Sequence, residues 1–349
     1  MTSKKIISAF LIFSLSVNVF SQTDKNWQNK IDSVIQIKTP TTFNGIILIA
    51  KKGKTVYSKA FGFSDIENKT PLKMSDQFEI MSNTKQITSV LVLKEVEKGK
   101  IDLHAPIKKY LPNLKQTWAD SVTVHQLLNH THGIVDVEKP LIFKPGTDFK
   151  YGNLSNILLG KIIENVSGKT YRQLASKLFK QLKMNDTFCY SKNEGRNLVF
   201  GYINKENTFT KVENSMINEE NLPADGVIST VNDLVIWNNN LHKGKILSPK
   251  FYQLMTTESA KSQHDVFGKE KMGYGYNIRT VDSNGIKYLG HTGLGDGFSS
   301  LNVYVPEADL HLIVLENQMN ENSNLFYYTE KLIKNIVFES EFVKPSLTD

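Results

Sequence analysis

The most constraining feature of this 349-residue chain is a segment that is apolar on every side of a helix. Residues 79–98 contain the run Ser89-Val90-Leu91-Val92-Leu93, and Gly99 follows as the residue type that most often ends a helix. A helix that is apolar all round is buried, because none of its faces suits water. The pattern therefore predicts a long central helix around which the rest of the chain packs.

The start of this helix carries an unusual pair, Ser82 and Lys85. Ser82 fits a helix cap, but Lys85 stands where a capping box has Glu or Gln, and a cation there costs about 0.3–1 kcal/mol. Residues three apart share a helix face, so the Ser82 hydroxyl and the Lys85 ammonium can meet. A serine becomes a nucleophile when a neighbour accepts its proton, so the pair is a catalytic candidate. The alternative interpretation is a cap followed by a surface lysine.

Strand patterns lie near both ends of the chain, and helical patterns lie between them. A hairpin is predicted over residues 45–61, and later strands are predicted at 273–281, 286–291, 298–305 and 310–315. Helices are predicted at 27–36, 123–128, 153–166, 170–182, 230–242 and 323–338. We therefore expect an α+β fold: one antiparallel sheet built from both chain ends and flanked by helices, with a mostly helical insert over about residues 101–230.

The first 21 residues have the pattern of a secretory signal peptide. Lys4 and Lys5 precede an apolar stretch at residues 6–17, and Ser21 ends a small-residue cleavage site. A retained membrane anchor is the alternative, but the apolar run is shorter than the roughly 20 residues that a bilayer requires. We expect a signal peptide at 1–21 and a single exported domain at 22–349, secreted or periplasmic, with no stable transmembrane span after signal removal.

Charge and cysteine content narrow the remaining classes. The formal net charge is +7, and the basic residues outside the predicted signal are interspersed with acidic ones. This distribution does not favour a nucleic-acid-binding protein, which would collect its cations into a patch. Cys189 is the only cysteine, so the core has to stabilise the fold without an internal disulfide.

Two further motifs combine reactive or hydrogen-bonding residues with loop signals. Tyr151-Gly152-Asn153 lies where a loop enters a predicted helix, and the alternative interpretation is a packed tyrosine beside an Asn cap. His291-Thr292-Gly293 ends a predicted strand and is followed by Leu294 and more glycines, which allow close approach of a ligand or backbone. Its alternative interpretation is an ordinary turn with an exposed histidine.

Taken in this order, the motifs Ser82-x-x-Lys85, Tyr151-x-Asn153 and His291-Thr292-Gly293 resemble the serine β-lactamase and penicillin-binding protein superfamily. The resemblance is closer to the class C-like branch, which also contains D,D-carboxypeptidases, D-aminopeptidases and esterases. It extends from about Gly45 to the last predicted helix. The supporting stretches are residues 127–134, 143–146 and 158–164.

The resemblance implies a mechanism in which Ser82 attacks a carbonyl and forms an acyl-enzyme that water then releases. Free lysine and tyrosine have pKa values of about 10.4 and 10, so both are protonated at neutral pH. Either a neutral Lys85 takes the Ser82 proton, or a charged Lys85 lowers the pKa of Tyr151. The sequence leaves the choice of general base between Lys85 and Tyr151 open.

The resemblance also implies the substrate-binding residues. Asn153 would bind the amide or ester flank of the substrate, while His291, Thr292 and Gly293 would line the opposite wall. The backbone N–H groups of Ser82 and Leu294 would stabilise the oxyanion. No metal and no organic cofactor are implied.

The chain departs from the class C pattern at His291 and Asp225. His291 replaces the lysine of a Lys-Thr-Gly motif, and a neutral imidazole binds a carboxylate less firmly than an ammonium does. His-Thr-Gly is more similar to the peptidase and esterase members. Asp225 stands where relatives commonly have glycine. A separate pair, His130 and His132, has metal-ligand spacing, but no third ligand lies at a convincing distance in the sequence.

We therefore expect an exported serine hydrolase that acts through an acyl-enzyme on a small amide, peptide or ester. A D-amino-acid peptide of the cell wall is one such substrate, which would make the protein a D,D-carboxypeptidase, a D-amino-acid peptidase or an esterase. The alternatives are a class C-like β-lactamase and a penicillin-binding protein that acylates without efficient turnover. The intact residues Ser82, Lys85 and Tyr151 argue against a scaffold that has lost its activity.

Overall fold

The computed structural model describes residues 26–192, 195, 197–283, 285–340 and 342–343. The predicted signal peptide at residues 1–21 lies outside the described residues. Among the helices of the described ranges, none is long and apolar enough to cross a bilayer.

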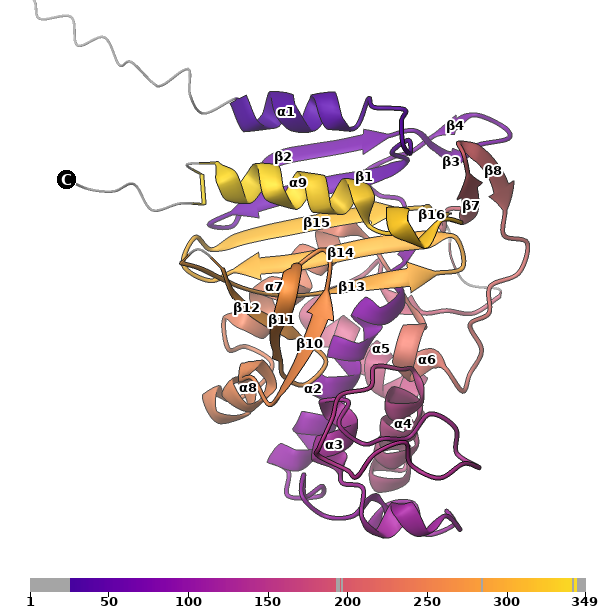
Figure 1. Ribbon diagram of the computed structural model, residues 1–349, viewed down its shortest axis with the longest axis vertical. Coiled ribbons are helices and arrows are strands. Elements are labelled where there is room, and N and C mark those ends of the chain that lie inside the picture. The colour runs from indigo at the N-terminus through magenta and orange to yellow at the C-terminus, as the bar shows by residue number, and fades with distance from the viewer. Residues whose placement is uncertain (1–25, 193–194, 196, 284, 341, 344–349) are drawn as a thin grey trace, which may run out of the picture.

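The centre of the molecule is a large antiparallel sheet. Its strands are β1 (Gly45–Lys51), β2 (Lys54–Phe61), β10 (Ala260–His264), β11 (Gly268–Tyr274), β12 (Arg279–Ser283), β13 (Ile286–Gly295), β14 (Phe298–Val305) and β15 (Leu310–Glu316). They lie side by side in the order β10-β11-β12-β13-β14-β15-β1-β2 (Figure 1). Because β1 pairs with β15, the first hairpin extends a sheet made by the C-terminal part of the chain. The predicted fold class is confirmed.

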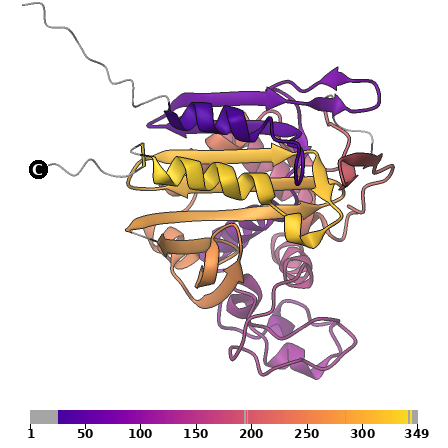
Figure 2. The ribbon, with the colours of Figure 1, turned by 45° about the horizontal axis from the view of Figure 1, so that its top comes forward.

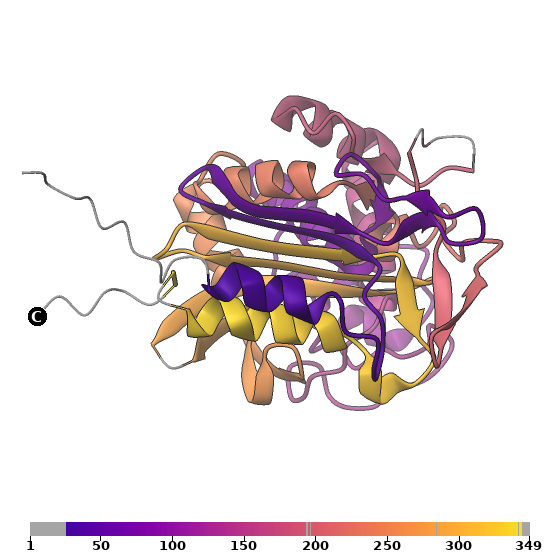
Figure 3. The same cartoon turned by 90° about the horizontal axis from the view of Figure 1, so that it is seen from above.

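The sheet separates two apolar cores. Helices α1 (Asn26–Val34) and α9 (Tyr328–Glu339) lie next to each other on one face, as Figure 3 shows from above. Ile47 and Ile49 of β1 belong to the core on that face, whereas Ile46 and Leu48 belong to the core on the other. This alternation follows from the two-residue repeat of a strand. The sheet lies between two layers of helices, so both faces of β1 are buried and its residues are apolar on both sides.

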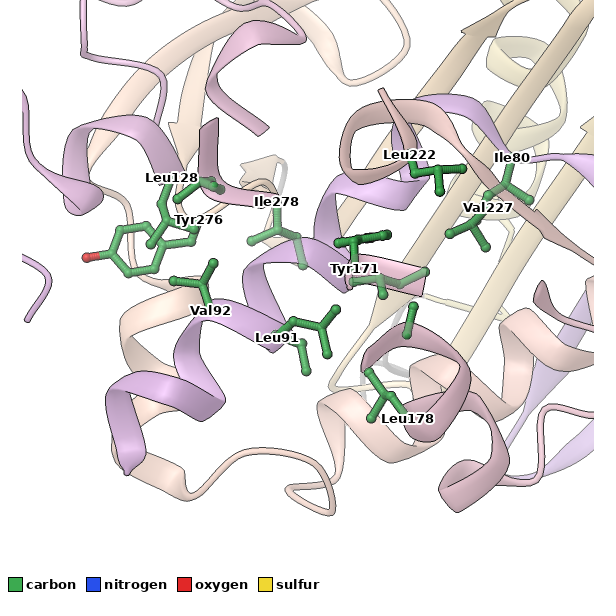
Figure 4. Close-up of a cluster of buried hydrophobic side chains, with 14 of the residues drawn as sticks. Ile80, Leu91, Val92, Leu128, Tyr171, Leu178, Leu222, Val227, Tyr276 and Ile278 are labelled. Carbon is green, nitrogen blue, oxygen red and sulfur yellow. The ribbon is translucent and has the colours of Figure 1, made fainter. Parts of the chain in front are cut away.

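The predicted central helix lies on the other face of the sheet. A 3₁₀ turn, η2 (Met81–Asn83), leads directly into α2 (Thr84–Glu97), whose residues from Thr84 to Leu93 are all buried. Figure 4 shows Leu91 and Val92 of this helix among side chains from several other elements, including Leu128 and Leu178. The prediction of a helix buried on all sides is confirmed.

The segment between β2 and α7 (Val231–His242) contains most of the remaining helices (Figure 2). These are η3 (Ile107–Lys109), η4 (Thr117–Asp120), α3 (Val124–Leu128), α4 (Leu154–Ser167), α5 (Tyr171–Leu182) and α6 (Leu222–Asp225). Thr123 and Thr170 form capping boxes at α3 and α5, and Gly168 ends α4 with φ of 69°. These local signals explain why the boundaries predicted for the three helices are close to the observed ones.

Short strands also occur around this segment. They are β3 (Phe63–Asp65), β4 (Thr70–Pro71), β5 (Phe78–Glu79), β6 (Phe188–Cys189), β7 (Tyr202–Lys205), β8 (Thr208–Lys211), β9 (Val227–Ser229) and β16 (Gln318–Asn320). In the small sheet β5-β9-β6, β5 pairs with β9 and ends two residues before the turn η2 (Met81–Asn83).

The strand predicted at 273–281 is wrong in extent, because the chain turns between β11 and β12. Asn277 has φ of 53°, and its backbone N–H donates to the Leu128 carbonyl instead of to a neighbouring strand. The sequence reading also omitted α8 (Pro249–Thr256) and the sheet-edge strand β10. At the C-terminus, the 3₁₀ turn η5 (Ser323–Leu325) precedes α9, which is shorter than predicted.

Candidate active site

Ser82 lies in the turn η2 and does not cap α2. Asn83 occupies the N-cap position, and its side chain makes no capping hydrogen bond. Met81, directly before Ser82, has φ of 48°, a conformation that costs energy for a residue other than glycine. The backbone before Met81 is held in place, because the Ile80 N–H donates to the Val227 carbonyl and the Ile80 carbonyl accepts from Ser300 Oγ at 2.8 Å. Strain of this kind is typical of a functional position held by its surroundings.

Lys85 is completely buried and contacts Ser82, as its position one helical turn away predicts. Its Nζ lies 2.7 Å from Ser82 Oγ, 2.8 Å from Asn153 Oδ1, 3.1 Å from the Ala224 carbonyl and 3.1 Å from Asp225 Oδ1. Burial lowers the pKa of the ammonium, but the Asp225 carboxylate and the Tyr151 hydroxyl outweigh burial, so the pKa of Lys85 is raised above its ordinary value. Lys85 is therefore a charged donor at neutral pH.

Asp225, at the end of α6, contacts both members of the pair. Its Oδ1 lies 2.9 Å from Ser82 Oγ and its Oδ2 accepts a hydrogen bond from the side-chain amide of Asn153. Sequence analysis noted Asp225 as a departure from the common glycine but assigned it no contact with Ser82. The structure brings together Ser82, Lys85, Asn153 and this carboxylate.

Tyr151 lies in the loop before α4, beside the cluster, and its hydroxyl contributes to the raised pKa of Lys85. Lys85 Nζ is 5.3 Å from the centre of the Tyr151 ring. The Tyr151 hydroxyl is buried, and it has no hydrogen-bond partner among the residues that the structure describes. The ring also packs at 4.7 Å, centre to centre, on the imidazole of His130.

Strand β13 brings the His-Thr-Gly motif against the turn that holds Ser82. A Cβ atom on Gly293 would lie 2.2 Å from the Ile80 carbonyl oxygen and 2.8 Å from Met81 Cβ, so only glycine permits this approach. Thr292 and Leu294, on either side of Gly293, line the same pocket as Ser82. The motif therefore adjoins Ser82.

His291 lies behind the pocket wall and is 1% exposed. Its Nδ1 is 2.7 Å from the Thr292 carbonyl, which can only accept, so Nδ1 carries the proton and Nε2 accepts from the Tyr274 hydroxyl at 3.1 Å. Burial, assisted by the positive charge of Arg279, holds the pKa of His291 well below its ordinary value. The imidazole is neutral, and neither nitrogen is available to a substrate.

The pocket beside Ser82 has a volume of about 280 Å³ and contains a cation that sequence analysis missed, Arg279 of β12. This arginine is 4% exposed, and its guanidinium lies over the rings of Phe267 and Tyr274 at 5.3 and 5.4 Å. Its Nε and Nη1 have no hydrogen-bond partner, and no carboxylate pairs with it, within the described part of the chain. The sequence offers one signal for this residue, because arginine is rare in the chain: only three of its 42 Lys and Arg residues are arginines.

The His130 and His132 pair serves the loop that supports Tyr151. His130 Nε2 donates to Asn277 Oδ1 at 3.0 Å, and its Nδ1 accepts from Ser155 Oγ at 3.1 Å. His132 Nδ1 accepts from the Ile134 N–H at 2.9 Å. Among the described residues, no group of three or more metal-binding side chains gathers in one place.

Comparison with known proteins agrees with this fold. The family profile described as Beta-lactamase matches residues 38–331. The molecule is a hydrolase of the β-lactamase fold. The chain belongs to the Beta-lactamase family, within the superfamily that also contains penicillin-binding protein homologues.

Three similar proteins illustrate the range of the superfamily. Protein flp of Staphylococcus aureus is 26% identical over an alignment of 338 residues, which covers 88% of this chain and 65% of the relative's length. The octameric penicillin-binding protein homologue from Pyrococcus abyssi is 27% identical with a TM-score of 0.76, covering 89% of this chain and 76% of that one. The D-amino acid amidase from Ochrobactrum anthropi SV3 is 20% identical with a TM-score of 0.75, covering 89% and 99%, and it shows the shared fold.

Proposed function

We propose that the protein is an exported serine hydrolase that forms an acyl-enzyme on Ser82 and releases a C-terminal amino acid from a short peptide. The proposal makes it a carboxypeptidase of the D,D type, with the cell-wall peptide as the natural class of substrate. The observation that carries it is the position of Arg279 in the pocket beside Ser82.

The Ser82 cluster supports nucleophilic catalysis. Lys85 donates to Ser82 Oγ at 2.7 Å, and a charged donor at this position stabilises negative charge as the oxygen attacks a carbonyl carbon. The attack forms the C–O bond of the acyl-enzyme, and the electron pair of the carbonyl moves to its oxygen. In the proposal, the backbone N–H groups of Ser82 and Leu294 bind that oxyanion. The C–N bond then breaks, the amine leaves with the proton that Ser82 lost, and water releases the acyl group.

Arg279 supports a substrate with a free carboxylate. Beside the pocket, the charge of Lys85 is balanced by Asp225 at 3.1 Å, whereas no acid among the described residues that line the pocket balances the charge of Arg279. A buried cation without a partner is costly, and a carboxylate can accept two parallel hydrogen bonds from a guanidinium. The role predicted for His291, orienting the terminal group of the substrate, therefore passes to Arg279 in this proposal.

The family and the names of the similar proteins support a substrate with D-amino acids and, more specifically, a cell-wall peptide. The similar proteins include penicillin-binding protein homologues and a D-amino acid amidase. A penicillin also carries a carboxylate beside its reactive amide, so we expect it to acylate Ser82. Export is supported by the signal pattern at residues 1–21, and the proposed location is secreted or periplasmic.

The test compares a peptide that ends in D-alanyl-D-alanine with the same peptide carrying a C-terminal amide. We expect the wild-type protein to release D-alanine from the free acid fastest, ahead of the amide, a p-nitrophenyl ester and a chromogenic cephalosporin. Arg279→Met should lower kcat/KM for the acid by about 10- to 100-fold and hardly change that for the amide, because only the acid loses a charged hydrogen bond. Faster turnover of the ester or the cephalosporin would contradict the proposal.

A further inference from the structure

His264, the last residue of the edge strand β10, lines the same pocket as Ser82 and Arg279. Its imidazole packs against two aromatic rings, with ring centres 5.6 Å from Phe267 and 5.1 Å from Tyr327. The imidazole is therefore held by packing at the wall of the site.

The hydrogen bonds of His264 determine which ring nitrogen carries its proton. Its Nδ1 accepts from the backbone N–H of Val266 at 3.4 Å, and a backbone N–H can only donate. Burial, assisted by the positive charge of Arg279, lowers the pKa of His264 to about 2, so the ring is neutral and has a single N–H group. That proton is on Nε2, because Nδ1 is the acceptor.

The Nε2–H group of His264 donates to the Thr292 hydroxyl. The two atoms, Nε2 and Thr292 Oγ1, lie 3.0 Å apart, so the oxygen accepts this bond and keeps its own proton for another acceptor. Thr292 is 3% exposed and lines the pocket. The hydroxyl of Tyr327 also interacts with Thr292 and lines the same pocket. An acceptor that enters the pocket can therefore compete for the Thr292 proton.

The direction of this hydrogen bond decides what Thr292 offers to a ligand. If residue 264 were an acceptor, Thr292 would donate to it and turn its proton away from the pocket. With a donor at 264, the pocket contains two donors for an anion: the Thr292 hydroxyl and the guanidinium of Arg279, whose Nε and Nη1 have no hydrogen-bond partner in the described part of the chain. A carboxylate has two oxygens and can accept from both donors.

We propose that His264 is a positioning residue, which holds the Thr292 hydroxyl as a hydrogen-bond donor for the terminal carboxylate of the substrate. His264 acts through Thr292 and does not itself touch the substrate. The donor is oriented before the substrate binds, which reduces the cost of ordering on binding. This inference rests on the proposed carboxypeptidase function and assigns a second determinant, besides Arg279, of the preference for a free acid.

The test measures kcat/KM for a peptide that ends in D-alanyl-D-alanine and for the same peptide with a C-terminal amide. His264→Phe keeps a ring and removes the N–H group, so it should lower kcat/KM for the acid by about 5- to 15-fold, the range of one hydrogen bond. The loss for the amide should be about 2-fold or less, because a hydrogen bond to a neutral acceptor is weaker.

His264→Gln separates a hydrogen-bond donor from a residue that only fills space. The glutamine Nε2 can donate in place of the imidazole Nε2, so kcat/KM for the acid should stay within about 3-fold of the wild-type value. A residue that only filled space would give the opposite order, because phenylalanine matches the shape of the ring better than glutamine does.

Thr292→Val tests whether His264 acts through Thr292. In this background, His264→Phe should lower kcat/KM for the acid by no more than about a further 2-fold, because the two residues belong to one network. His104→Phe is the matched control. His104 is exposed and is not among the residues that line the pocket, so the same substitution there should leave kcat/KM unchanged for both peptides.

The position of the proton can be measured without a substrate or a variant. In nitrogen-15 NMR spectra of the wild-type protein labelled on histidine, the His264 ring is identified by its contacts with the rings of Phe267 and Tyr327. Its proton should be on Nε2. A proton on Nδ1 would overturn the inference, including in the case that the variants of His264 do not fold.

The outcomes distinguish the two proposals. Equal losses in His264→Phe and His264→Gln, equal losses for the acid and the amide, or a full additional loss in the Thr292→Val background would each overturn the role of His264. A wild-type protein that does not release D-alanine from the acid would instead overturn the proposed function. The NMR measurement then still decides whether His264 donates to Thr292.

Discussion

The ammonium of Lys85 and the carboxylate of Asp225 form a buried ion pair, with Nζ and Oδ1 3.1 Å apart and side-chain exposures of 0% and 9%. The pair lies directly beside the Ser82 hydroxyl. It joins α2 to α6, which are more than a hundred residues apart in sequence. The pair therefore sets the charge state of the site and also contributes to the stability of the fold.

The first prediction concerns the stability of this ion pair. Lys85→Met should lower the free energy of unfolding by about 3–5 kcal/mol, because it leaves the Asp225 carboxylate buried without its cation. Chemical denaturation followed by circular dichroism measures the change. Adding Asp225→Gly to this variant should recover part of the loss, since the unpaired charge is then removed.

The surface pair Lys161 and Glu220 is the control for this prediction. Its side chains are 50% and 63% exposed, so Lys161→Met should change the free energy of unfolding by no more than about 1 kcal/mol. Equal losses for Lys85→Met and Lys161→Met would show that the buried pair is not a special source of stability.

The second prediction concerns the dependence of stability on pH. Burial lowers the pKa of His132 from 6.5 to about 4, so the unfolded chain binds a proton between these values that the native protein does not bind. Unfolding is therefore favoured as pH falls: the His132 contribution is full above pH 6.5 and is lost toward pH 4, by up to about 3 kcal/mol.

His132→Asn should remove this part of the pH dependence. The Asn carbonyl can accept from the Ile134 N–H in place of the imidazole, so the loop keeps its hydrogen bond. Glu79, whose pKa burial raises to about 8, titrates equally in both proteins and cancels in the comparison. Denaturation curves of the two proteins that shift in parallel over this pH range would contradict the assignment.

The third prediction concerns the contact between β13 and the Ser82 turn. Gly293→Ala should destabilise the protein by about 1–3 kcal/mol and slow the labelling of Ser82, because its Cβ would overlap the Ile80 carbonyl at 2.2 Å. Thermal unfolding and probe labelling measure the two effects. A Cβ on Gly152 meets nothing within 4 Å, so Gly152→Ala should leave the melting temperature near that of the wild type. Similar melting temperatures for the two variants would refute the close contact.

Local signals made the central helix and most of the sheet predictable from the sequence. The apolar run of α2 has no polar face, and caps at Thr123 and Thr170 mark the starts of two other helices. The pairing of Ser82 with Lys85 also follows from helical spacing alone. These features depend on residues close together in the chain, so the sequence pattern carries them.

Features that depend on tertiary packing were not predictable in this way. Asp225 is 143 positions from Ser82, and only the placement of α6 against α2 brings the two together. Arg279 follows a turn at Asn277, and the side chain and backbone of Asn277 are hydrogen-bonded to distant segments. These long-range bonds leave no local signal, so the sequence pattern predicted one continuous strand where the chain turns. The buried position of His291 likewise results from packing against Tyr274 of β11.

The central claim is that Ser82 is the nucleophile, and covalent labelling followed by mass spectrometry tests it most directly. A fluorophosphonate or penicillin probe should form one adduct on the wild-type protein, located on the peptide that contains Ser82. Ser82→Ala should show no adduct and should remain folded, because Lys85 keeps its three other hydrogen-bond acceptors. Undiminished labelling of Ser82→Ala, or an adduct on another residue, would contradict the account.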